Sequence, residues 1–194
     1  MTPRTEEQFK KIRVEKRQLI LDAALELFAD QGYHSTSISQ LATKAGISKG
    51  LLYNYFENKE SVLKTIIDEG FNDIFSDFIN FKENQFTNEH MKKYINHMFD
   101  SLTGKQNFWK FYFQIILQSS AQAIVKEKLE TFLMPVMEIM TQFFENNGYD
   151  DPYTEALILG ALFDGIGMDY AFAPEYFPLE KVKKNLLNKY CNIK

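Results

Sequence analysis

The chain has 194 residues and a formal net charge of −4, with 22 lysines and arginines against 26 aspartates and glutamates. The single cysteine, Cys191, excludes an intrachain disulfide framework and is typical of a reducing, cytoplasmic environment. No apolar run approaches the roughly 18 residues of a membrane-spanning helix, and the polar start MTPRTEEQFKKIRVEK lacks a signal-peptide core. Taken as an average, the net charge argues mildly against a nucleic-acid-binding protein.

The first part of the chain predicts four consecutive helices, each with a recognisable start or stop. Apolar residues recur at steps of three and four before Gly32, which favours an amphipathic helix that stops at this glycine. Ser37 followed by Gln40 forms a capping box, while Ser48 and Asn58 are further N-cap residues. The expected helices cover residues 15–31, 37–45, 48–55 and 58–75.

The later part predicts five more helices and no strand. Residues 107–121 are apolar nearly all round, which indicates a central buried helix. Pro135 should kink the long pattern that contains it, and Asp151-Pro152 is a cap followed by a proline at the first helical position. The expected helices cover residues 88–102, 107–121, 123–146, 152–171 and 178–190. The sequence therefore predicts an all-α fold.

Charge and aromatic residues are unevenly distributed along the chain. Residues 1–64 hold ten basic and eight acidic residues, whereas residues 65–194 hold 12 basic and 18 acidic residues. Only six of the 29 aromatic residues lie in the first segment. No Pro/Gly/Ser-rich linker separates the two segments, so we expect two domains, 1–64 and 65–194, that share a continuous helix.

The two short helices 37–45 and 48–55 have the features of a DNA-binding helix-turn-helix. Gly46 lies in the turn between them, and apolar residues on both helices can fix the crossing angle. The second helix would lie in the major groove, with its N-terminal residues towards base edges. Those residues are Ser48, Lys49, Gly50 and Leu51, followed one turn later by Tyr53 and Asn54. Tyr53 and Tyr55 offer hydroxyl groups to phosphate, and Lys59 adds positive charge at a helix N-terminus.

Residues 33–63, YHSTSISQLATKAGISKGLLYNYFENKESVL, resemble the DNA-binding segment of the tetracycline-repressor (TetR/AcrR) family, and the preceding ILDAALELFADQGY also matches. The resemblance implies an all-helical homodimer, with a three-helix DNA-binding domain followed by a six-helix ligand-binding and dimerisation domain. It also implies DNA contacts by Thr36, Ser37, Lys49, Gly50, Tyr53, Asn54, Tyr55 and Lys59. Asn54 departs mildly from the family pattern, which leaves base preference at this position open.

A cluster of basic residues extends from Arg4 to Arg17, across the start of the first expected helix, and residues 1–14 are interpreted as a basic arm. The arm either lies free in solvent or contacts phosphate or the minor groove. The two interpretations are equally compatible with the sequence.

The later part favours a cavity for a small hydrophobic or aromatic effector. Met, Phe, Tyr and Trp are concentrated between residues 91 and 144, and methionine is typical of adaptable binding surfaces. A plain packed core is the alternative for each of these residues. The candidate ligand-binding residues are Tyr94, Met98, Trp109, Tyr112, Phe113, Ile116, Met137 and Met140.

The last two expected helices carry stripes that favour dimerisation. Small residues on the first of them would let a partner helix approach closely, although an intramolecular packing face would have the same pattern. The candidate dimer residues are Leu157, Ala161, Asp164 and Met168 on the first helix, and Val182, Leu186 and Tyr190 on the second.

The sequence predicts a dimeric, ligand-responsive transcriptional regulator, most simply a repressor of a near-palindromic operator. No cofactor or membrane partner is expected. A metal site is not expected either, because His90, His97 and Asp100 share a helix face but are not joined by the three or four converging ligands that a metal usually needs. An enzyme is one alternative, but phosphate-loop, nucleophile-elbow and zinc-protease motifs are absent. A helical binding protein that has lost DNA affinity is the other.

Overall fold

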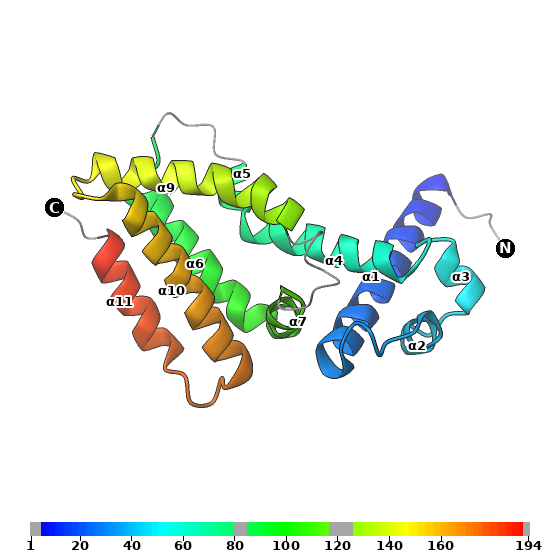
Figure 1. The fold of residues 1–194 in the computed structure, drawn as a ribbon. Coiled ribbons are helices and arrows are strands. Elements are labelled where there is room, and N and C mark those ends of the chain that lie inside the picture. Colours follow the sequence, from blue (N-terminus) through cyan, green and yellow to red (C-terminus); the bar gives the residue numbers. More distant parts are fainter. Residues whose placement is uncertain (1–4, 80–84, 117–125, 192–194) are drawn as a thin grey trace. The chain divides into compact units, whose positions relative to one another are not determined.

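The computed structural model describes residues 5–79, 85–116 and 126–191 (Figure 1). All regular secondary structure in these ranges is helical, which confirms the predicted all-α class. The elements are α1 (Glu6–Gln31), α2 (Ile38–Lys44), α3 (Lys49–Tyr53), α4 (Lys59–Ile74), α5 (Ser76–Ile79), α6 (Asn88–Gly104), α7 (Gln106–Ile116), the π-helical turn η1 (Leu129–Leu133), α9 (Met134–Asn146), α10 (Pro152–Phe172) and α11 (Leu179–Cys191). No helix within the described ranges is both long and apolar enough to cross a bilayer.

The chain divides into two compact units, residues 1–68 and 69–194. Helix α4 is continuous through this division, so its first part belongs to the first unit and its last part to the second.

The short helix α5 was not predicted, since four residues are too few to establish a helical period.

Helix α1 is longer than predicted, and this corrects the interpretation of residues 1–14 as an arm. The helix begins after Thr5, whose hydroxyl accepts a hydrogen bond from the Gln8 amide while the Gln8 side chain accepts one from the Thr5 amide. This capping box satisfies amide groups that would otherwise lack partners. Glu6 and Glu7 lie in the first turn, where negative charge is favoured by the helix dipole.

Helices α2 and α3 form the predicted helix-turn-helix. Gly46 ends α2 with a φ of 65°, in the left-handed region that favours glycine. The Gly46 amide donates to the Thr43 carbonyl at 3.1 Å, and the Ile47 amide to the Ala42 carbonyl at 3.0 Å. This pair of bonds is a Schellman motif, which satisfies the last carbonyls of α2 and turns the chain sharply into α3.

Lys59, the first residue of α4, joins this helix to the loop between α1 and α2. Its Nζ donates hydrogen bonds to the carbonyl oxygens of Tyr33 at 2.7 Å, Thr36 at 2.8 Å and His34 at 3.3 Å. The same ammonium lies 4.3 Å from the centroid of the Tyr33 ring, in cation–π contact. Burial lowers the pKa of Lys59, and the three carbonyl acceptors compensate part of the hydration that the ammonium loses. Lys59 therefore fixes the segment from which α2 starts.

In the second unit, α10 packs against α9, α7 and α6, and α11 packs against α6 (Figure 1). Helix α7 buries residues such as Phe108, Trp109 and Phe111, but Lys110 and Gln114 on its other side are half-buried, so the helix is less completely buried than predicted. The last five residues of the predicted helix 107–121 lie outside the described ranges. Asn147-Gly148 and the Asp151 cap end α9 and start α10 where the sequence indicated.

The predicted break near Pro135 is present as a change of helix type. Residues Leu129–Leu133 form the π-helical turn η1, which continues into α9 with Pro135 near its start. Proline has no amide hydrogen and its ring clashes with a preceding carbonyl, so a wider turn before it relieves the conflict.

Helices α4 and α7 approach each other at Gly70 without room for a side chain. A Cβ atom on Gly70 would lie 2.0 Å from Cε2 and 2.1 Å from Cζ of Phe108. The Phe108 ring is held in place because it is buried and lies next to Trp109 and Tyr112, with centroids 5.7 and 6.1 Å away. Only glycine permits this contact.

Replacing Lys59 by methionine should loosen the loop before α2. The methionine retains much of the apolar stem but loses the three carbonyl contacts, each of the kind that contributes about 1–3 kcal/mol when the donor is charged. We expect faster hydrogen exchange in residues 33–45 of the Lys59→Met variant. Lys64→Met is the matched control, because Lys64 is exposed on the same helix. Equal exchange in both variants would contradict this role.

Replacing Gly70 by alanine should destabilise the second unit by about 1–3 kcal/mol, the usual cost of overpacking a core. The control is Gly104→Ala, because a Cβ there meets nothing within 4 Å and alanine is the better helix former. Urea denaturation followed by the fluorescence of Trp109, the single tryptophan, measures both variants beside the native chain. Equal stability of the two variants would show that the Phe108 ring moves freely.

Candidate DNA-binding surface and ligand cavity

Helix α3 presents a polar face above a buried apolar one. Lys49, Gly50, Tyr53 and Asn54 are exposed, whereas Leu52 on the opposite side is fully buried. Ser48 is exposed at the N-cap, where its hydroxyl accepts the Leu51 amide hydrogen at 3.1 Å. The predicted recognition residues thus lie on or directly beside one short helix, which consists of the five residues Lys49–Tyr53 rather than the predicted 48–55.

Four other predicted DNA-contact residues have different surroundings. Ser37 is exposed and caps α2, with its hydroxyl accepting the Gln40 amide hydrogen at 3.3 Å. Leu51 and Tyr55 are half-buried beside α3, so only part of each side chain faces solvent. Thr36 is 1% exposed, and its hydroxyl donates to the Gly32 carbonyl at 2.9 Å.

The positions of Thr36 and Lys59 correct the predicted role of their side chains. Both side chains are used inside the first unit: Thr36 holds the loop to the end of α1, and Lys59 binds three loop carbonyls. They position the N-terminus of α2 and do not present their polar atoms on the exposed face that α3 forms. The sequence signal for this arrangement was weak, because a lysine at a helix start is equally typical of a phosphate contact.

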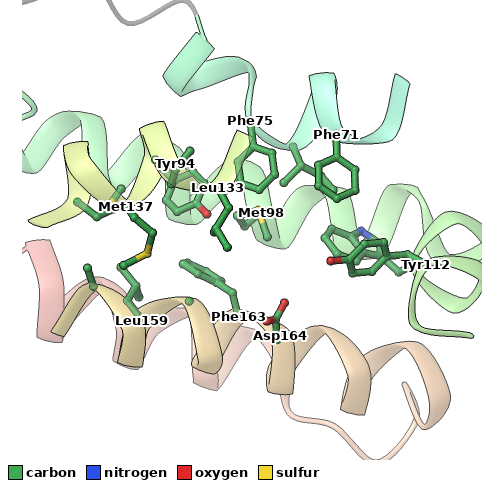
Figure 2. Close-up of a pocket in the computed structure, with 16 residues that line it drawn as sticks. Phe71, Phe75, Tyr94, Met98, Tyr112, Leu133, Met137, Leu159, Phe163 and Asp164 are labelled. Carbon is green, nitrogen blue, oxygen red and sulfur yellow. The ribbon is translucent and has the colours of Figure 1, made fainter. Parts of the chain in front are cut away.

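The second unit contains a cavity of about 120 Å³ among α4, α6, α7, α9 and α10 (Figure 2). Sixteen residues line it, and most of them are aromatic or aliphatic. The lining residues are Phe71, Ile74, Phe75, Tyr94, Met98, Trp109, Tyr112, Leu133, Val136, Met137, Met140, Ala156, Leu159, Gly160, Phe163 and Asp164. Six of the predicted ligand-binding residues are in this set: Tyr94, Met98, Trp109, Tyr112, Met137 and Met140.

Phe113 and Ile116 do not line the cavity. Phe113 is buried against α10, where its Cζ would be 3.0 Å from a Cβ added at Gly167, and Ile116 is half-buried at the end of α7. Conversely, the residues contributed by α4 were missed. Phe71 and Ile74 extend the apolar spacing of Ile66 and Ile67 along α4, and this continuation was the available signal.

Two polar side chains of the cavity, those of Asp164 and Tyr112, lie towards one end of it (Figure 2). Trp109 donates its Nε1 hydrogen to the Ser101 hydroxyl at 3.2 Å in the core. Asp164 and Tyr112 point towards this end from α10 and α7 (Figure 2). Burial, followed by the nearby Asp164 charge, raises the pKa of Tyr112, and burial raises the pKa of the Asp164 carboxyl. Asp164, predicted as a dimer residue, is therefore a cavity residue in this structure.

The predicted dimer residues separate into two groups. Leu157 and Met168 are each 46% exposed on α10, and Ala161 is exposed between them. Leu186 and Tyr190 on α11 are buried within the single chain, and Val182 is half-buried. Tyr190 packs edge-on to Phe144 with centroids 5.8 Å apart. The prediction that Leu186 and Tyr190 face a partner is corrected, because their stripe is an intramolecular packing face.

Among the residues that the structure describes, no three His, Cys, Asp or Glu side chains converge as metal ligands. His90 Nδ1 lies 3.1 Å from the Thr87 amide, His97 Nε2 lies 3.7 Å from the Asp73 carboxylate, and Asp100 pairs with Lys183 at 3.2 Å. The three residues that share this helix face have separate partners.

Residues 20–66 match the family model described as "Bacterial regulatory proteins, tetR family". This segment covers α2 and α3, the part of α1 from Ile20 to Gln31, and the part of α4 from Lys59 to Ile66. The chain is 41% identical over 68 residues to the uncharacterized HTH-type transcriptional regulator YuxN of Bacillus subtilis, which is 35% of this chain and 23% of that protein. The match therefore spans about a quarter of the relative's length.

The fold resembles solved structures over nearly the whole chain. The fatty acid degradation regulator FadR from Bacillus halodurans has a TM-score of 0.76 and 22% identity, over 91% of this chain and 94% of that one. FadR from Bacillus subtilis, in complex with stearoyl-CoA, has a TM-score of 0.72 and 22% identity, over 91% and 98%. The helix-turn-helix segment is therefore similar to that of the tetR family of bacterial regulatory proteins, and the fold is similar to that of the two FadR regulators.

Proposed function

We propose that the protein is a ligand-responsive repressor that binds a near-palindromic operator as a homodimer and is released by a small hydrophobic effector. The observation that best supports DNA binding is the exposed polar face of α3. It places a lysine, a tyrosine and an asparagine beside a glycine that allows close approach of the helix to a groove. The matched relatives are transcriptional regulators rather than enzymes, which favours a regulator over catalysis.

The apolar cavity supports effector binding. Its aromatic and methionine lining suits a hydrophobic compound, and a related fold binds stearoyl-CoA. Helix α4 contributes Phe71 and Ile74 to the cavity wall, while Lys59 at its other end fixes the loop before α2. An effector that binds best when α4 is displaced would alter this loop and lower DNA affinity.

The exposed face of α10 supports dimerisation. Tyr153, Leu157, Met168 and Phe172 are 46–58% exposed and recur at helical spacing. Cβ atoms at Gly160 and Gly165 would meet nothing within the chain, so a second helix has room to approach. Several large apolar residues exposed on one helix are typical of a protein interface. The two recognition helices of a dimer would then read half-sites roughly 34–36 Å apart.

Lys49→Ala and Tyr53→Ala should each weaken operator binding by about tenfold and leave the fold intact, since each removes one contact worth about 1–3 kcal/mol. The operator is first selected from a random DNA pool, and affinity is then measured by gel shift. For Lys49→Ala, the slope of affinity against salt should fall by about one unit if the lysine contacts phosphate.

Lys44→Ala is the control for this series, because Lys44 lies on α2 and pairs with Glu26. It should bind DNA like the native chain. Native affinity of both α3 variants would refute the assigned surface, and failure to select any DNA sequence would favour a helical binding protein that has lost DNA affinity.

Leu157→Glu should convert the dimer to a monomer at micromolar concentration, because it places a charge in the centre of the exposed apolar face. Sedimentation velocity measures the change. Lys184→Glu on the polar face of α11 is the control with the same added acid and should stay dimeric. A native chain that sediments as a monomer, or a dimeric Leu157→Glu variant, would remove this interface.

A further inference from the structure

One residue distinguishes the cavity from a purely apolar one. Of the described residues that line it, only Asp164 has an acidic side chain, and none is a lysine, arginine or histidine. Within the described part of the chain, Asp164 is not engaged in an ion pair or side-chain hydrogen bond. The carboxyl group at the edge of this apolar cavity therefore has no cationic partner among the described residues.

The walls of the cavity are rich in aromatic side chains. Phe71 lies edge-on to Tyr112 with centroids 5.9 Å apart, and Tyr94 lies edge-on to Phe163 at 5.3 Å. Both pairs are in the cavity lining, together with Trp109 and Phe75. Aromatic ring faces attract cations, and more strongly when water is partly excluded. Both the aromatic rings and the carboxylate therefore favour a positively charged ligand.

The position of Asp164 suits the head group of an amphiphilic ligand. Asp164 is a partly exposed residue of α10, and its carboxylate points from that helix towards the cavity (Figure 2). An apolar body inside the cavity would leave its charged end beside this carboxylate. A ligand with a carboxylate at that end would place two like charges together, which disfavours binding.

We propose that the cavity selects hydrophobic ligands that carry a positively charged nitrogen, which pairs with Asp164. This proposal rests on the cavity being the effector site, and it concerns the charge of the ligand alone. The raised pKa of Asp164 agrees with it, because a carboxylate that has lost hydration without gaining a partner is stabilised by an incoming cation.

Three probes with one body and different charge test the proposal: 3-phenylpropylammonium, 3-phenylpropan-1-ol and 3-phenylpropanoate. One benzene ring suits the cavity, since a comparable apolar cavity of 150 Å³ binds benzene in another protein. Trp109 lines the cavity and is the single tryptophan of the chain, so its fluorescence reports occupancy in the full-length protein. We expect the ammonium to bind about tenfold more tightly than the alcohol, corresponding to about 1.4 kcal/mol, and the carboxylate to bind most weakly.

Asp164→Asn should reduce the preference for the ammonium over the alcohol to less than about threefold while it keeps the affinity for the alcohol, which shows that the cavity is intact. Its stability at neutral pH should equal or exceed that of the native chain, because desolvation disfavours the carboxylate that it removes. Asp169→Asn, an exposed change on the same helix outside the lining, should keep the native preference.

Equal affinity of the three probes for the native chain would overturn the charge preference and leave the cavity as an effector site. A preference that persists in Asp164→Asn would overturn the role of this carboxylate. Binding of none of the probes would overturn both the preference and the effector site, whereas DNA binding through α3 is judged separately by the Lys49 and Tyr53 variants.

Discussion

The contact between Gly70 and Phe108 is the constraint on which the proposed response depends. At this point α4 and α7 touch without space for one additional carbon atom, and interiors packed this closely shift between discrete arrangements rather than deform gradually. Phe108 is followed by the cavity residues Trp109 and Tyr112, and Gly70 is followed by Phe71. A ligand that displaces the rings on α7 must therefore change the packing of α4.

The other end of α4 has its own constraint. Lys59 binds three carbonyls of the loop that leads into α2, so the start of the helix-turn-helix depends on where α4 begins. The contacts of Lys59 lie in the first compact unit and the contact of Gly70 with Phe108 lies in the second, and the single helix α4 contains both Lys59 and Gly70. Coupling between DNA and effector then needs only that the two ligands favour different positions of this helix.

The sequence predicted the parts of the fold that short-range hydrogen bonds determine. Ser37, Ser48 and Asn58 each cap a helix through groups three residues away, so their sequence pattern is sufficient. The arm was misread because apolar periodicity is absent before residue 15, although Thr5 and Gln8 already formed a readable capping box. The domain boundary at residue 64, and the DNA, effector and dimer contacts, stay predictions.

Long-range packing explains what the sequence left undecided. A helical stripe shows that one face is buried, but not whether its partner is the same chain or a second copy; Leu186 and Tyr190 therefore looked like interface residues. Asp164 was assigned to the same stripe because nothing local indicates that α10 turns it towards a cavity. The net charge of −4 also failed to indicate a DNA-binding segment, because it is the sum over a basic first segment and an acidic second one.

We propose that DNA and the cavity ligand bind opposing arrangements of α4, so each should weaken the binding of the other by the same factor. The affinity of 3-phenylpropylammonium is measured by Trp109 fluorescence with and without saturating operator selected from random DNA. Linkage requires that DNA weakens ligand binding by the same factor by which the ligand weakens DNA binding. Our account predicts a reduction of about five- to 150-fold in both directions, and equal ligand affinity with and without operator would contradict it.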